Sequence, residues 1–152
     1  METCILSGPI GSGKTTRLQH WVGEQPSARG IVSPVVEGKR RFRHLPGGSW
    51  REMEAEPGER DVLATPRYRF SAAAFRWAEA CLQEDVRHQP DWIVLDEIGK
   101  LELRGEGFAS FLKGILADQA VPHLLLVVRA ELLPEVRQQF GMGAVTHWRP
   151  GY

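Results

Sequence analysis

Three glycines, a lysine and two threonines stand close together near the start of the chain, in the stretch GPIGSGKTT at residues 8–16. Their spacing is G-x-x-x-x-G-K-[ST]. Glycine lets a backbone curl until successive N–H groups point at one centre, where they bind phosphate oxygens. A lysine at this spacing places a compact cation beside the β- and γ-phosphates, and a threonine hydroxyl is a ligand for Mg²⁺. The stretch therefore predicts a site for a nucleoside triphosphate.

The expected nucleotide-binding residues are the whole stretch: Gly8, Pro9, Ile10, Gly11, Ser12, Gly13, Lys14, Thr15 and Thr16. We expect Lys14 to act in catalysis as well, because its charge lies beside the transferred phosphoryl group, and Thr15 to bind Mg²⁺. The flanking sequence agrees with this interpretation. Residues 3–7 predict a buried strand, and residues 14–25 have the periodicity of a helix. A helix that starts at the loop adds unpaired N–H donors and its positive dipole end.

An acidic pair follows an apolar strand in the second half of the chain, in IVLDE at residues 93–97. A phosphate loop needs a nearby carboxylate to hold Mg²⁺, and Asp96 is in the position typical of that acid. Glu97 places a second carboxylate beside the metal, where it could orient and deprotonate the water that attacks the γ-phosphate. The pair therefore favours hydrolysis over binding alone.

Two arginines follow later apolar strands. Arg129 comes after HLLLVV at residues 123–128, and Arg149 after AVTHW at residues 144–148. In an open α/β sheet, ligands bind beyond the carboxyl ends of the strands, so both side chains are expected on the edge that carries the phosphate loop. We expect Arg129 to be catalytic, by neutralising charge on the transferred phosphoryl group, although a surface role remains the alternative for both arginines.

The remaining pattern indicates an α/β fold. Predicted strands at 3–7, 91–96, 123–128 and 144–148, most of them rich in apolar residues, are separated by predicted helices at 14–25, 71–87, 107–119 and 131–140. Strands buried on both faces and separated by helices predict a mostly parallel sheet flanked by helices. Residues 30–55 are expected to form an antiparallel ribbon inserted into it. We expect a single domain over residues 1–152.

The composition argues against several classes of protein, namely nucleic-acid-binding, disulfide-rich and membrane proteins. Of 152 residues, 42% are hydrophobic, and 19 basic side chains balance 19 acidic ones. Nucleic acid as the main ligand is not supported by this zero net charge, although a local patch would allow it. Two cysteines provide no disulfide framework. Without a signal peptide or a membrane span in the sequence, we expect no membrane partner and a cytoplasmic location. The oligomeric state is left open, and a monomer is consistent with the sequence.

Two further clusters have open roles. KRRFRH at residues 39–44 is basic, and it is interpreted as a solvated ribbon, a lid over phosphates or a nucleic-acid contact with Phe42 available for stacking. PRYRF at residues 66–70 could bring Arg67 or Tyr68 near the nucleotide.

The chain resembles the cancer-related nucleoside-triphosphatase family in METCILSGPIGSGKTTRL, RGIVSPVVEGKRRF, PRYRFS and IVLDEIGKLEL, which occur in the family's order. DEIGKLE is the most specific segment, because the family typically has D-E-I-G-K-M-E there. The resemblance implies a RecA-like P-loop fold and slow Mg²⁺-dependent hydrolysis of ATP, GTP and other nucleoside triphosphates to the diphosphate and phosphate. It also implies a phosphate loop at residues 8–16, a metal ligand at Asp96 and a base at Glu97, and it matches Lys100 to a family lysine.

Two other functions remain alternatives to a hydrolase. One is a small-molecule or nucleotide kinase that uses the same loop, with the basic cluster as a lid. The other is a nucleotide-dependent module that binds RNA or a protein. Selection of guanine through N-K-x-D is excluded, because the sequence contains no asparagine, and no base is preferred.

Overall fold

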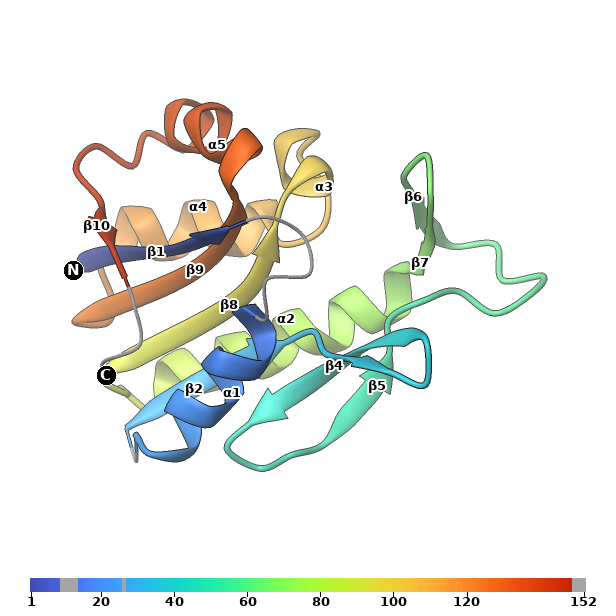
Figure 1. The fold of residues 1–152 in the computed structure, drawn as a ribbon, viewed down its shortest axis with the longest axis horizontal. Coiled ribbons are helices and arrows are strands. Elements are labelled where there is room, and N and C mark those ends of the chain that lie inside the picture. Colours follow the sequence, from blue (N-terminus) through green and yellow to red (C-terminus); the bar gives the residue numbers. More distant parts are fainter. Residues whose placement is uncertain (9–13, 26, 149–152) are drawn as a thin grey trace.

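The computed structural model describes residues 1–8, 14–25 and 27–148. Within these ranges the chain forms an eight-stranded mixed sheet, a separate two-stranded hairpin and several helices (Figure 1). The order of strands along the main path of the sheet is β10-β1-β9-β8-β2-β4-β3, and β5 pairs with β4. The mostly parallel α/β arrangement predicted from the sequence is confirmed.

The parallel part of the sheet contains five strands. They are β10 (Thr146–His147), β1 (Glu2–Gly8), β9 (His123–Arg129), β8 (Trp92–Ile98) and β2 (Ala28–Val32). The four predicted apolar segments are confirmed as strands, and β8 runs two residues further than expected, through the acidic pair. All five strands point the same way, so their carboxyl ends share one edge of the sheet.

Helices cover both faces of this sheet. α1 (Lys14–Gly23) packs on one face, where Leu18 and Val22 meet Leu6, Val94 and Val127. α2 (Ala72–Arg87), α4 (Ala109–Asp118) and α5 (Leu133–Gln139) pack on the other, against the alternate strand residues. Such alternation follows from the two-residue period of a strand. No helix in the described ranges is long and apolar enough to cross a membrane.

Three tryptophans meet on the α1 face. The ring of Trp21 lies edge-on to Trp92 at a centroid distance of 4.9 Å and to Trp148 at 4.8 Å. Aromatic rings prefer such edge-to-face packing because their positive edges meet negative faces. These contacts join the last turn of α1 to the start of β8 and to the residue after β10.

The predicted antiparallel ribbon is present, and its first strand also belongs to the parallel sheet. β2 pairs in parallel with β8 and is therefore a strand of the main sheet. Antiparallel pairing starts at Gly30 of β2, which lies opposite Leu45 of β4 (Lys39–Leu45). β3 (Val35–Val36) and β5 (Trp50–Glu52) also pair antiparallel with β4. The ribbon expected over residues 30–55 is therefore confirmed, whereas the parallel pairing of its first strand with β8 was not predicted.

A hairpin leads from the ribbon into α2. β6 (Val62–Ala64) pairs with β7 (Arg69–Ser71), and α2 follows immediately. The predicted cap is confirmed, because the Ser71 hydroxyl accepts a hydrogen bond of 3.2 Å from the Ala74 N–H. The short helix α3 (Lys100–Leu103) was not predicted, and it follows β8 directly. Both short elements flank the carboxyl edge of the sheet.

Candidate functional site

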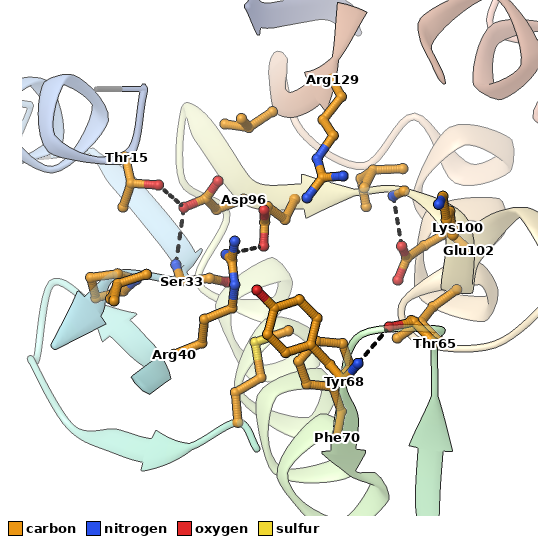
Figure 2. Close-up of a pocket in the computed structure, with 18 of the residues that line it drawn as sticks. Thr15, Ser33, Arg40, Thr65, Tyr68, Phe70, Asp96, Lys100, Glu102 and Arg129 are labelled. Carbon is orange, nitrogen blue, oxygen red and sulfur yellow. Dashed lines mark hydrogen bonds and ion pairs between the residues drawn. The ribbon is translucent and has the colours of Figure 1, made fainter. Parts of the chain in front are cut away.

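A cavity of about 580 Å³ lies at the carboxyl edge of the parallel strands. Its walls come from α1, the loop after β2, the ribbon, the hairpin, the end of β8 with α3, and the end of β9 (Figure 2). Five of the predicted site residues line it: Thr15, Thr16, Asp96, Glu97 and Arg129. Elements far apart in the sequence thus place these residues around one space.

The phosphate-loop motif has the expected context of a strand followed by a helix. β1 ends at Gly8 and α1 begins at Lys14. Residues 9–13 and the Lys14 side chain lie outside the described part of the structure, as does Arg149. The register of the sheet pairs Gly8 with Arg129, so this arginine stands beside the first residue of the loop.

The two predicted metal ligands meet directly. The Thr15 hydroxyl donates a hydrogen bond of 2.8 Å to Oδ2 of Asp96, and the Ser33 N–H donates one of 3.0 Å to the same oxygen. Asp96 is only 1% exposed. A buried carboxylate fixed by a backbone N–H is therefore presented beside a hydroxyl, and both kinds of oxygen suit Mg²⁺.

A second observation agrees with a bound hydrated ion or phosphate. The Ser33 hydroxyl is buried, lines the cavity and has no hydrogen-bond partner among the described residues. Buried polar atoms without a partner are rare in folded proteins, so each calls for an explanation such as an ion or water. The donor set next to the cavity therefore fits Mg²⁺ with its waters.

A β-bulge points both acids into the same cavity. In a regular strand, Asp96 and Glu97 would face opposite sides of the sheet. The β8–β9 register shifts between Leu95 and Ile98, and Glu97 adopts a φ of +64°, in the left-handed region. Bulges re-aim side chains and are frequent beside active sites. The bulge thus gives Glu97 access to the same cavity as Thr15 and Asp96.

Glu97 forms an ion pair with Arg40 of the ribbon, between Oε2 and Nη1. Both side chains are largely buried, at 29% and 17% exposed. The Arg40 guanidinium also lies 5.9 Å from the centre of the Tyr68 ring. Sequence analysis did not single out Arg40 from its basic cluster, although it lines the cavity.

Phe42 and Arg41 of the basic cluster make their contacts outside the cavity. Phe42 is completely buried against Phe75, so the hypothesis that Phe42 stacks on a nucleic-acid base was wrong. Arg41 pairs with Glu52, and its guanidinium lies 4.0 Å from the centre of the Trp50 ring. Alternation along β4 thus sends Arg40 and Phe42 inward and Arg41 outward.

The hairpin reaches the site as expected. Arg67 and Tyr68 line the cavity together with Thr65, whose hydroxyl accepts a hydrogen bond of 3.1 Å from the Tyr68 N–H. The Tyr68 ring stacks on Phe70 at a centroid distance of 5.4 Å. Arg67 and Tyr68 thus line the same cavity as Asp96, and their expected position near a nucleotide stays a prediction.

Comparison with known proteins identifies the family. A family model described as NTPase matches residues 3–147. The chain belongs to this NTPase family. Its fold is that of THEP1 from the hyperthermophile Aquifex aeolicus, at 21% identity and a TM-score of 0.72, over 97% of this chain and 88% of that one. A human cancer-related nucleoside triphosphatase is also similar, at 21% sequence identity and a TM-score of 0.64, over 98% of this chain and 88% of that one.

A curated relative of another kind matches part of this NTPase. The replication origin-binding protein of Equine herpesvirus 1 (strain Ab4p) is 28% identical over 100 residues, which are 62% of this chain. The match covers only 11% of the viral protein's length. The family model and the two structures confirm both the P-loop NTPase fold and the resemblance found in the sequence.

Sequence analysis did not single out Glu102, a buried acid that lines the cavity of this NTPase. Glu102 is 2% exposed, and its carboxylate accepts hydrogen bonds from the Gly99 N–H at 2.8 Å and the Phe108 N–H at 2.9 Å. Glu102 thereby connects the residue before α3 to the loop after it, and Lys100, the first residue of α3, lines the cavity. Desolvation raises the pKa of Glu102 to about 7, against the lowering effect of these two hydrogen bonds, and the Glu97 charge raises it further.

Proposed function

We propose that this NTPase is a Mg²⁺-dependent nucleoside-triphosphatase that converts ATP, GTP and other nucleoside triphosphates to the diphosphate and phosphate. The observation that carries the proposal is the convergence of Thr15, Asp96 and Glu97 on one cavity beside the phosphate-loop helix. Membership of the NTPase family supports the same reaction. No asparagine is present for an N-K-x-D motif, so we propose no selection among bases on that route.

Thr15 and Asp96 would hold Mg²⁺, which supplies positive charge to the β- and γ-phosphate oxygens when bound. The backbone N–H groups of residues 8–16 and the Lys14 ammonium would hold the phosphates in line with the attacking water. In this proposal the loop and the Mg²⁺ ion bind the negatively charged phosphates, and Glu97 at the bulge is the general base.

Glu97 would accept the proton of the attacking water. The water oxygen forms a bond to the γ-phosphorus, and the bond from that phosphorus to the bridging oxygen breaks. The nucleoside diphosphate leaves with the electron pair, and the proton moves to the Glu97 carboxylate. Arg129, beside Gly8, would neutralise charge on the phosphoryl oxygens during transfer.

The test is phosphate release from ATP and GTP with Mg²⁺, in the wild type, Glu97→Gln and the control Glu135→Gln. Glu135 is an exposed acid of α5 outside the cavity. We expect Glu97→Gln to lower turnover by roughly 10²- to 10⁴-fold and to keep its affinity for a fluorescent ADP analogue. Equal turnover in Glu97→Gln would remove this acid from the mechanism. A wild type that binds nucleotide and releases no phosphate would contradict the hydrolase proposal.

A further inference from the structure

Arg40 lines the cavity next to the residues proposed to hold and attack the nucleotide. Its guanidinium holds the carboxylate of Glu97, the proposed base, inside the cavity. Figure 2 shows Arg40 and Arg129 entering the cavity from opposite sides. In this view Asp96 lies between the two arginines. The two arginines come from unrelated elements, the ribbon strand β4 and the end of β9.

The backbone of Arg40 is fixed while its side chain spans the gap to β8. The Arg40 N–H donates a hydrogen bond of 2.9 Å to Oε2 of Glu54, and its carbonyl accepts one of 3.1 Å from the Met53 N–H. Only the side chain therefore has to move for the guanidinium to change partner. The Tyr68 ring, 5.9 Å away, provides a π-face beside that path.

The Arg40–Glu97 pair would be weaker than the contact that replaces it. An arginine bound to Glu97 meets one negative charge, whereas a terminal phosphate group carries about −2 at neutral pH. Guanidinium also matches phosphate geometry with two parallel N–H donors. Binding of a triphosphate beside Thr15 and Asp96 therefore favours transfer of Arg40 from Glu97 to the phosphoryl oxygens.

Transfer of Arg40 would assist the reaction at both Glu97 and the phosphoryl group. Glu97 loses the donor that covers Oε2, and the carboxylate can then accept a hydrogen bond from water. The phosphoryl group gains a cation on the side opposite Arg129, where charge grows in the transition state. We propose that Arg40 is a catalytic arginine of this site, held by Glu97 in the nucleotide-free protein and exchanged onto the terminal phosphoryl group during hydrolysis. The inference rests on the proposed hydrolase function.

The experiment compares wild type, Arg40→Ala, Arg40→Lys and Arg41→Ala. Arg41 is the matched control, because it is the adjacent arginine of β4 and pairs with Glu52 away from the cavity. Steady-state phosphate release gives kcat and KM. Titration of ADP with Mg²⁺, alone and with aluminium fluoride as a mimic of the transferred phosphoryl group, separates ground-state from transition-state binding. Thermal unfolding checks that each variant is folded, and Arg40→Lys retains the packing of the stem.

We expect Arg40→Ala to lower kcat by roughly 10²-fold, the size seen when one transition-state donor is removed. The ADP dissociation constant should stay within about twofold, and that of the aluminium fluoride complex should rise at least tenfold. Arg40→Lys should recover part of kcat, because it restores a charge without the forked donors. Arg41→Ala should match the wild type.

Other results would overturn the inference. A higher kcat in Arg40→Ala would mean that Arg40 only restrains Glu97, and unchanged kcat and aluminium fluoride affinity would give it a structural role. Either result with an active wild type contradicts the assignment of Arg40 and leaves the hydrolase function intact. A wild type that releases no phosphate contradicts the proposed function itself and this assignment with it.

Discussion

The hydroxyl of Thr15 donates a hydrogen bond of 2.8 Å to Oδ2 of Asp96, although the two residues are 81 positions apart in the chain. One belongs to the first turn of α1 and the other to the bulge of β8. Because the two side chains are in contact, the proposal that they bind Mg²⁺ can be tested with a small substitution at Thr15 or at Asp96.

Thr15→Val and Asp96→Asn should each weaken the apparent affinity for Mg²⁺ by more than about tenfold, because even indirect ligand partners are worth about 10- to 100-fold. Turnover measured against Mg²⁺ concentration gives this affinity. Thr15→Ser keeps the hydroxyl and should remain close to the wild type. An unchanged Mg²⁺ requirement in both variants would exclude the pair as ligands.

Arg129→Ala should lower turnover more than nucleotide affinity, because Arg129 stands beside Gly8 and is proposed to act on charge that develops during transfer. The measurement is kcat from phosphate release together with the dissociation constant of ADP. Arg76→Ala is a suitable control, since Arg76 forms a surface ion pair with Asp61. Equal kcat in the two variants would remove Arg129 from the mechanism.

Glu102 should make stability fall as pH rises. Its pKa is about 7 in the folded protein against an ordinary value of 4.5. Between these values the unfolded chain releases a proton that the folded protein keeps, so the free energy of unfolding decreases with pH. The group contributes about 3 kcal/mol over this range. Below pH 4.5 it is protonated in both states, and above about pH 7 it is ionised in both.

Chemical denaturation at several pH values checks this prediction against Glu102→Gln. The variant is neutral throughout, so the wild type should lose stability relative to it between pH 4.5 and about 7. The glutamine also loses one backbone partner, which shifts its whole curve by about 1 kcal/mol without adding a slope. Parallel curves for the two proteins would show that Glu102 does not titrate in this window.

Gly30→Ala should destabilise the sheet by at least about 2 kcal/mol. A Cβ at this position would lie 2.0 Å from the Val94 carbonyl oxygen, and the φ of Gly30 is +150°. The obstacle is backbone of the neighbouring strand β8, which cannot move aside as a side chain could. Gly47→Ala is the control, because a Cβ there meets nothing within 4 Å. Thermal unfolding should show a drop of at least about 4 °C for Gly30→Ala alone.

Local patterns were sufficient to predict four of the five strands of the parallel sheet and the two segments that meet at the cavity. The phosphate-loop motif and the acids after β8 are each contiguous, and each lies where a parallel sheet ends. Arg40 was missed because its role depends on a partner from another strand. The alternation of β4 does indicate it: Phe42 is apolar and inward, and Arg40 shares its face.

Glu102 was missed for a different reason. It stands at the third position of the four-residue helix α3, and its carboxylate bonds the Gly99 N–H just before that helix. An acid three residues after a helix start is a capping signal, so D-E-I-G-K-L-E does contain a sign of α3. The bulge at Glu97 has no comparable sign, because it arises from the pairing of β8 with β9.

The packing of Trp21 gives the chain an optical reporter of its own. Indole emission responds to neighbouring rings and to solvent, and Trp21 touches two other indoles edge-on. Its helix, α1, begins at Lys14, within the phosphate-loop motif of residues 8–16. A displacement of α1 caused by a ligand at that loop would alter both ring contacts together, so occupancy of the loop can be followed by fluorescence of the unlabelled protein.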